Sequence, residues 1–327
     1  MATGEQVKKL LAAHRDHDDA TFFRVAQSII ADETAANHHI LARELKKALG
    51  DQKKSGDLVV LPTGKDRVSL LNVRRSEISR DRLVLTSRTS KKIERVLLEH
   101  KSVLRLAKHG YQPKRKLLFW GPPGCGKTLT AHFLAHELGL EIGTVRLSSL
   151  ISSYLGDTAT HLESVFEIAN KSPMVLLIDE VDAVGKTRDD PNDVGELKRV
   201  VNTLLQAMDN FVGNQSILIA ATNHEYVLDA ALWRRFDDAI EFPLPEEVEI
   251  YADLKRLLSG IEFEASLKSI VPMLISLSFA EIERITTEAV KTMILEHRDF
   301  LTYEDIAGQL EQLKRHSVID TERKQDS

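Results

Sequence analysis

Apolar positions change their spacing twice along the chain, and each change predicts a different kind of structure. In the first fifty residues, apolar side chains recur every three or four positions, which predicts helices. From about residue 115, short apolar runs alternate with helical patterns, as in βαβ units on a parallel sheet. After Pro243 and Pro245 only helical spacing returns. The runs that predict strands are 116–120, 142–147, 174–178, 217–221 and 239–242.

These patterns divide the chain into four parts. Residues 1–50 form a small helical N-terminal domain that ends at Gly50, a residue favoured just past a helix end. Residues 51–69, with Gly, Pro and charges, form a linker. Residues 70–245 form an α/β core, and residues 246–327 form an all-helical C-terminal part. Within the core, residues 82–85 are a candidate edge strand, and a long amphipathic helix extends from Ile93 to Leu106.

Composition and charge narrow the class of protein. The chain has 327 residues and 43% hydrophobic residues, as expected for a protein with a packed core. A net charge of −5 gives no reason to expect nucleic acid or a membrane as a partner. Its single cysteine, Cys125, rules out an internal disulfide framework. No apolar stretch approaches the ~20 residues of a membrane span, and the N-terminus lacks a signal-peptide pattern. We expect a cytoplasmic protein.

The clearest motif follows the first predicted core strand. Residues 121–128 read Gly-Pro-Pro-Gly-Cys-Gly-Lys-Thr and open a helix, which is the context a P-loop requires. The glycines let the backbone turn and aim N–H groups at phosphates, and the helix N-terminus adds positive potential. Lys127 would reach the β- and γ-phosphates of ATP, and Thr128 would coordinate Mg²⁺. The expected nucleotide-binding residues are Gly121, Pro122, Pro123, Gly124, Cys125, Gly126, Lys127, Thr128, Leu129 and Asp179.

Two carboxylates, Asp179 and Glu180, follow the apolar run 174–178. In an open α/β sheet, ligands bind at the carboxyl ends of the strands, so both acids should lie near the P-loop. Asp179 would hold Mg²⁺ through water, and Glu180 would orient and deprotonate the attacking water. An isolated acidic pair of this kind is more often a solvated strand end, but its place after a P-loop favours catalysis.

With these motifs, residues 70–315 resemble the AAA+ superfamily, and more closely the AAA proteins that remodel or unfold other proteins. Residues 218–223 resemble the sensor-1 strand, in which Asn223 would lie between the acidic pair and the γ-phosphate. Residues 232–236 resemble the arginine-finger segment of a branch with two adjacent arginines before a phenylalanine. Arg234 and Arg235 would therefore stabilise the transition state in a neighbouring subunit. Which of the two contacts the γ-phosphate stays open.

A further resemblance concerns the segment Tyr154, Leu155 and Gly156. It is similar to the aromatic–hydrophobic–glycine loop that lines the central pore of protein translocases. A tyrosine ring can contact an extended polypeptide without reading its sequence, because the contact is broad and amphipathic. The alternative is that Tyr154 packs at the start of a helix.

The resemblance implies an Mg²⁺-dependent ATPase that works as a homo-oligomeric ring, expected to be a hexamer. Such a ring would remodel, unfold or translocate a protein substrate. Short helices ahead of one AAA module are similar to bacterial ATPases encoded beside a subtilisin-like protease. That likeness would make a separately encoded protease a partner, and defence against phage a role.

Two other functions fit parts of the sequence. A nucleotide-dependent switch acting on nucleic acid needs a P-loop but no pore loop, and the basic stretch 101–116 could contact nucleic acid. We interpret that stretch as a solvated helix face. A pseudo-ATPase scaffold would not need the complete set of acids and arginines. At Cys125, a helix N-terminus could lower the thiol pKa and favour oxidation, although a tolerated small side chain also explains the residue.

Overall fold

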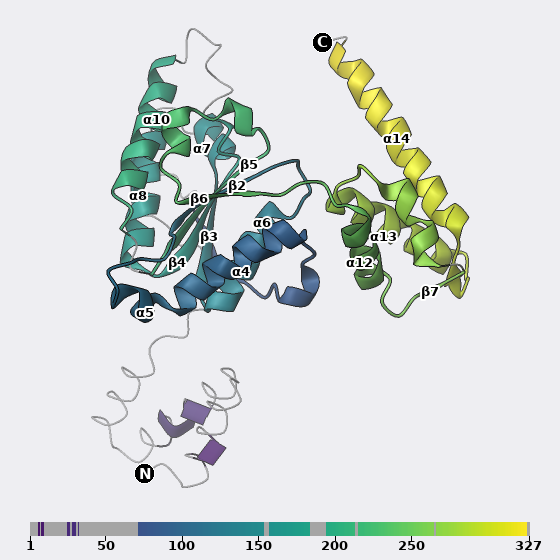
Figure 1. The fold of residues 1–327 in the computed structure, drawn as a ribbon, viewed down its shortest axis with the longest axis horizontal. Coiled ribbons are helices and arrows are strands. Elements are labelled where there is room, and N and C mark those ends of the chain that lie inside the picture. Colours follow the sequence, from purple (N-terminus) through teal and green to yellow (C-terminus); the bar gives the residue numbers. More distant parts are fainter. Residues whose placement is uncertain are drawn as a thin grey trace. The chain divides into compact units, whose positions relative to one another are not determined.

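A computed structural model describes residues 71–153, 157–183, 194–212, 215–264 and 266–325 (Figure 1). A few earlier positions are also described, and all of them are helical: 6, 8, 9, 25, 26, 28–30 and 32. The chain separates into two compact units, Met1–Asp57 and Leu58–Ser327, and the second contains the fold discussed below. Most of the predicted N-terminal domain, 1–50, and the whole predicted linker, 51–69, lie outside the described residues.

A six-stranded sheet forms the centre of the core, with strand order β1-β3-β4-β5-β2-β6. Strands β2 to β6 run parallel, and β1 pairs antiparallel with β3 at one edge. All five predicted core strands are present, with ends shifted by at most one residue. The strands are β1 (Asn72–Arg75), β2 (Lys116–Trp120), β3 (Glu141–Arg146), β4 (Met174–Asp179), β5 (Ile217–Thr222) and β6 (Asp238–Glu241).

Helices cover both faces of this sheet, which explains why β4 and β5 are continuous apolar runs. On one face, Leu118 and Leu176 pack with α8 and α10; on the other, Leu117 and Leu177 pack with α4 and α6 (Figure 1). The α/β sandwich predicted from the sequence is confirmed. The helices are α4 (Ser87–Lys101), α5 (Val103–Ala107), α6 (Lys127–Leu138), α7 (Leu147–Ser153), α8 (Thr158–Lys171), α10 (Val194–Asp209) and α11 (Ala230–Trp233), with a 3-10 turn η3 (Glu225–Val227).

The predicted edge strand at 82–85 is wrong. The chain there forms a 3-10 turn, η1 (Arg80–Arg82), followed by irregular backbone in which Leu83 is buried. The edge of β3 is instead taken by β1, which pairs antiparallel with it. The predicted long helix is also divided, because the chain turns at Ser102 between α4 and α5.

The C-terminal part, here called the lid, is mainly helical, as predicted. Its helices α12, α13 and α14 enclose an apolar core of their own. Two details differ from the prediction. The segment 267–277 forms two 3-10 turns, since Pro272 cannot donate a backbone hydrogen bond inside a continuous helix. A pair of two-residue strands, too short to show any periodicity, also lies in the lid. The elements are α12 (Glu247–Leu257), β7 (Glu262–Phe263), η4 (Leu267–Ser269), η5 (Val271–Leu274), α13 (Phe279–Leu295), β8 (Phe300–Leu301) and α14 (Tyr303–Gln325).

A membrane-crossing helix is not found among the described residues, where no helix is both long and apolar enough.

Candidate functional site

A pocket of about 410 Å³ lies at the carboxyl ends of β2, β4 and β5. It is lined by the P-loop, by residues at the end of β4 and just after β4 and β5, by residues 82–84, and by residues of the lid helices. Strand β2 lies between β5 and β6, whereas β3, the next strand in the chain, lies on the far side of β4. The pocket is therefore at the switch point of the sheet, where open α/β folds bind ligands.

The P-loop backbone adopts conformations that glycine alone takes readily. Gly121, Gly124 and Gly126 have φ values of 136°, 74° and 90°. At Gly121 an added Cβ would overlap the backbone carbonyl of Phe242, just after β6. Gly126 is the N-cap of α6, and no side chain caps this helix. The first amides of α6 are thus left to bind an anion.

Lys127 begins α6 and is buried in the pocket wall, 7% exposed. Its Nζ donates to the carbonyl oxygens of Gly121 at 2.6 Å and Pro122 at 2.7 Å, so the ammonium group is held inside the loop. Burial lowers the pKa of Lys127, because the charged form loses hydration. An anion at this point would supply the negative partner that the buried ammonium otherwise lacks.

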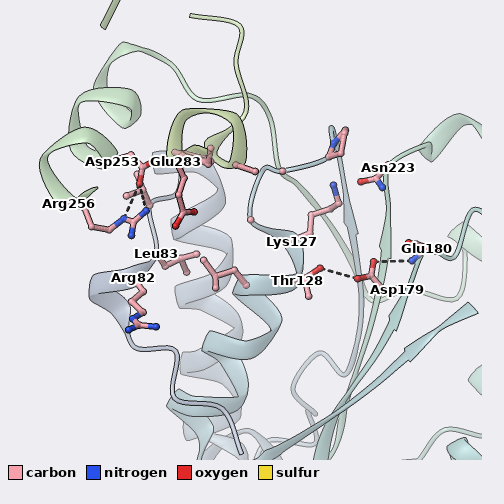
Figure 2. A pocket seen from close by; sticks show the side chains of 17 residues that line it. Arg82, Leu83, Lys127, Thr128, Asp179, Glu180, Asn223, Asp253, Arg256 and Glu283 are labelled. Atoms are coloured by element: carbon pink, nitrogen blue, oxygen red, sulfur yellow. Dashed lines mark hydrogen bonds and ion pairs between the residues drawn. The ribbon is translucent and has the colours of Figure 1, made fainter. Parts of the chain in front are cut away.

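Thr128 connects the P-loop to the end of β4. Its Oγ1 donates to Oδ2 of Asp179 at 3.0 Å (Figure 2). A hydroxyl beside a carboxylate is an oxygen-rich pair of the kind that holds Mg²⁺, which takes few protein ligands and completes its shell with water and phosphates. The residues present therefore fit this metal ion.

Glu180 is positioned by both its backbone and its side chain. Its φ of 56° is unusual for a residue other than glycine. The backbone amide donates to Oδ1 of Asp179 at 2.9 Å, and the next amide, of Val181, donates to the carbonyl of Ala221 at 3.0 Å. The hydroxyl of Ser148, on α7, donates to the Glu180 carboxylate. Sequence reasoning missed Ser148, because a serine that follows a strand belongs to no motif.

Asn223 follows β5 and lines the same pocket. Figure 2 shows it with Asp179 and Glu180 on one side of Lys127. The preceding Thr222 is buried and donates from Oγ1 to Asp182 at 3.0 Å, which fixes the end of β5. The structure thus brings the predicted P-loop, acidic pair and asparagine together.

The two adjacent arginines differ from each other. Arg235 donates from Nε and Nη2 to the two carboxylate oxygens of Asp209, each at 2.9 Å, and from Nη1 to the carbonyl of Ala231 at 2.8 Å. Arg234 is exposed, and its guanidinium has no hydrogen bond or ion pair among the described residues. Neither arginine lines the pocket of its own chain. The sequence alone does not distinguish the two arginines, because Asp209 lies on another helix, α10, well before them in the chain.

Two other predictions meet different outcomes. Tyr154, Leu155 and Gly156, the predicted pore loop, lie outside the described residues. Cys125 is buried, 2% exposed, and burial raises the pKa of its thiol above its ordinary value. Desolvation outweighs the nearby Lys127, which favours the other interpretation of Cys125, a tolerated small side chain, over an oxidation-prone thiolate.

The lid closes the other end of the pocket against the P-loop. The backbone amide of Ala280, in the first turn of α13, donates to the carbonyl of Gly124 at 3.1 Å. An added Cβ at Gly124 would lie 2.7 Å from Oγ of Ser278 and 2.9 Å from Cβ of Ala280. The lid also contributes three charged residues that sequence reasoning missed: Asp253, Arg256 and Glu283. An Asp and an Arg three positions apart on a helix look like an ordinary surface pair, so nothing marked them.

We expect Gly121→Ala to destabilise the fold and weaken nucleotide binding. The new Cβ would have to displace backbone at Phe242, and a side chain is disfavoured at this φ; together these should cost about 1–3 kcal/mol in the free energy of unfolding. Gly260→Ala is the matched control, since Gly260 has a φ of 82° but no atom within 4 Å of an added Cβ. Urea unfolding and nucleotide titration measure the two effects. Equal losses in both variants would contradict the role of the Phe242 contact.

Comparisons with known proteins show which family this chain resembles. Residues 117–244 match the family described as "ATPase family associated with various cellular activities (AAA)". The chain is 41% identical over 305 residues to an uncharacterised AAA family ATPase of Sinorhizobium fredii, covering 91% of each chain. It is 37% identical over 232 residues to a proteasome-activating nucleotidase of Pyrococcus horikoshii, which covers 64% of this chain and 57% of that protein.

A third relative is a putative 26S proteasome regulatory subunit homolog of Methanocaldococcus jannaschii, 35% identical over 208 residues. That match covers 61% of this chain and 55% of the relative. The chain therefore spans just over half the length of these last two relatives, and nearly the whole length of the first.

Proposed function

Because the chain belongs to the AAA family of ATPases and hydrolyses ATP, we propose that it uses this hydrolysis to remodel a protein substrate. The observation that carries the proposal is the convergence of the P-loop, the acidic pair and Asn223, from three separate strands, on one pocket. The names of two relatives, a proteasome-activating nucleotidase and a putative 26S proteasome regulatory subunit homolog, support a protein as the substrate.

In this proposal the P-loop binds the triphosphate. Lys127 exchanges its two loop carbonyl partners for the β- and γ-phosphate oxygens, and the free amides at the start of α6 bind the same group. Thr128 and Asp179 hold Mg²⁺, which would neutralise phosphate charge when bound. The 3.0 Å contact between their oxygens supports this role, because both can turn toward one ion without backbone movement.

Glu180 is proposed as the general base. It takes a proton from the attacking water while the water oxygen bonds to the γ-phosphorus, the bond from that phosphorus to the bridging oxygen breaks, and ADP leaves. Asn223 orients the water, and Ser148 positions the Glu180 carboxylate by its hydrogen bond. Asp179 and Ala221 hold the backbone on both sides of Glu180, which supports a defined carboxylate position.

We further propose a homo-oligomeric ring, of six subunits, in which each pocket is completed by a neighbour. Arg234 is the residue that acts in the neighbouring pocket, because its guanidinium is exposed and unpaired among the described residues. Arg235 has a different role: bound to Asp209, it fixes the end of the short helix α11, which stops just before Arg234. This division of roles follows from contacts within one chain.

The proposed substrate contact is the segment Tyr154, Leu155 and Gly156, which the sequence places between α7 and α8. A separately encoded protease as the recipient of the remodelled protein is also proposed, and the names of the two proteasome-related relatives support it. A switch acting on nucleic acid is the competing function, and the stimulus for hydrolysis separates the two.

Unfolded protein should stimulate ATP hydrolysis by the wild-type chain, and DNA should not. Tyr154→Ala should reduce the ratio of stimulated to unstimulated hydrolysis to about one, because the aromatic side chain that contacts the polypeptide is removed. Tyr303→Ala, at an exposed tyrosine of the lid, should keep the wild-type ratio. Phosphate release with and without unfolded casein or duplex DNA measures this. Stimulation by DNA alone would favour the nucleic-acid switch.

A further inference from the structure

Arg234 lies in a short stretch of chain, residues 233–237, here called the arginine segment. At its start, the ring of Trp233 meets that of Trp120, the last residue of β2, edge to face, with ring centroids 6.5 Å apart. In its middle, Arg235 binds both carboxylate oxygens of Asp209 on α10. The guanidinium of Arg234 itself is exposed, so its position depends on how firmly the residues around it are held.

Asp237, the last residue of the arginine segment, is bound to the amino end of β2. Its Oδ2 accepts hydrogen bonds from the backbone amides of Arg115 at 2.7 Å and Lys116 at 2.9 Å. Its own amide donates to the carbonyl oxygen of Lys116 at 2.7 Å. One residue thus makes three hydrogen bonds with two consecutive residues of the core. Two of these bonds are accepted by a carboxylate, and bonds to a charged group are stronger than bonds between neutral groups.

The strand that holds Asp237 carries the P-loop at its other end. β2 ends at Trp120, and the first P-loop glycine, Gly121, follows directly. β6 begins at Asp238 and pairs in parallel with β2 along four residues (Figure 1). Asp237 therefore leads into the strand beside β2, at the end of the sheet opposite the pocket. One strand holds both the P-loop of a subunit and the segment that carries its exposed arginine.

We propose that Asp237 is a positioning residue for ATP hydrolysis in the neighbouring subunit: it places Arg234 by tying the arginine segment to the amino end of β2. This inference rests on the proposed function, because it requires Arg234 to act in a neighbour's pocket. It adds a residue that acts through Arg234 and not on the nucleotide. Since a displacement of about 1 Å in a catalytic group can cost ~10²-fold in rate, loss of this anchor should lower kcat.

The experiment keeps one pocket constant and varies only the subunit that supplies the arginine. Arg234→Ala subunits provide an intact pocket, and Lys127→Ala subunits provide the arginine. Asp237→Ala, which removes both bonds to the amides, or Asp237→Asn, whose amide oxygen can still accept them, is added to the Lys127→Ala subunit. All hydrolysis then takes place in the Arg234→Ala pocket, so a defect in the supplying subunit's own pocket has no effect on the result.

The subunit with Lys127→Ala and Asp237→Ala should restore about 10–100-fold less hydrolysis at saturating ATP than Lys127→Ala alone, with an unchanged KM for ATP. With Asp237→Asn the restored activity should stay within about threefold of that with Lys127→Ala, because the hydrogen bonds persist but lose their charge. Glu99→Ala is the matched control. Glu99, on α4, accepts from the backbone amide of Lys114 at 3.2 Å, so it holds the residues before β2 from outside the arginine segment. Its replacement should leave the restored activity unchanged.

Phosphate release measures the restored activity, while thermal unfolding and co-purification of differently tagged subunits show that each variant folds and co-assembles. Equal restoration with and without Asp237→Ala, or an equal loss with Glu99→Ala, would overturn the positioning role and leave the shared pocket intact. If Lys127→Ala subunits themselves restore nothing, the shared pocket is overturned and this inference with it. If Asp237→Ala does not co-assemble, Asp237→Ser, with a shorter and uncharged acceptor, replaces it and the same outcomes decide.

Discussion

Replacing Glu180 with glutamine is expected to slow ATP hydrolysis by about 10²–10⁴-fold, the usual contribution of a general base. An amide has the size of a carboxylate but cannot take a proton from water. Nucleotide binding should persist, because Lys127, Thr128 and Asp179 are unchanged, and the amide oxygen can still accept from Ser148. The variant should therefore accumulate with ATP bound.

Single-turnover phosphate release and nucleotide titration measure the two properties separately. Glu167→Gln is a suitable control, since Glu167 is an exposed carboxylate of α8, paired only with Lys171 one turn away. A Glu180→Gln variant with wild-type turnover would refute the assignment of the base. Lost nucleotide binding would instead show that Glu180 supports the metal or the phosphates.

Arg234→Ala is expected to reduce hydrolysis by about 10³–10⁵-fold, the range measured for arginine fingers in phosphoryl transfer. The loss should be partly reversed by mixing with Lys127→Ala subunits, which are themselves inactive. A Lys127→Ala subunit cannot hold nucleotide but still carries Arg234, which it supplies to the intact pocket of an Arg234→Ala neighbour. Activity should appear in the mixture although neither component has it.

The sharpest control is a subunit with both substitutions. Mixed with Arg234→Ala, it supplies no arginine and should restore nothing. Arg235→Ala provides a comparison, because Arg235 is bound to Asp209 in its own chain; its loss should lower thermal stability as well as hydrolysis. If Arg234→Ala rings stay inactive with Lys127→Ala subunits that co-assemble with them, pockets are not shared between subunits.

The parts of the site that could be predicted from the sequence are those whose residues lie next to one another along the chain. The P-loop is recognisable because strand, glycines, lysine and helix follow one another directly. Its conformation is local too, since it depends on the positive φ angles of its own glycines. Asp179 and Glu180 are recognisable because a fully buried strand ends at them. Strands β2, β4 and β5 were predictable for the same reason, since burial on both faces leaves continuous apolar runs.

What the sequence did not reveal depends on tertiary contacts. Asp209 and Arg235 are far apart in the chain, so only the fold shows that one arginine is clamped and the other exposed. Asp253 is buried only because α12 packs into the lid core, and by spacing alone it pairs with Arg256 like any surface residue. Residues 82–85 have the apolar character of a strand, but in the fold Leu83 is buried by irregular backbone that follows a 3-10 turn.

The contact between Gly124 and the start of α13 couples the P-loop directly to the lid helix. The fixed end of the helix is the P-loop, since the amide of Ala280 donates to the Gly124 carbonyl and an added Cβ at Gly124 would have no room beside Ser278 and Ala280. The 17 residues of α13 span about 25 Å at ~1.5 Å per residue, so a tilt of roughly 10° at this end would move the far end by about 4 Å. In the proposed ring, a tilt of this size during turnover would be felt by any neighbouring subunit that contacts the far end of α13.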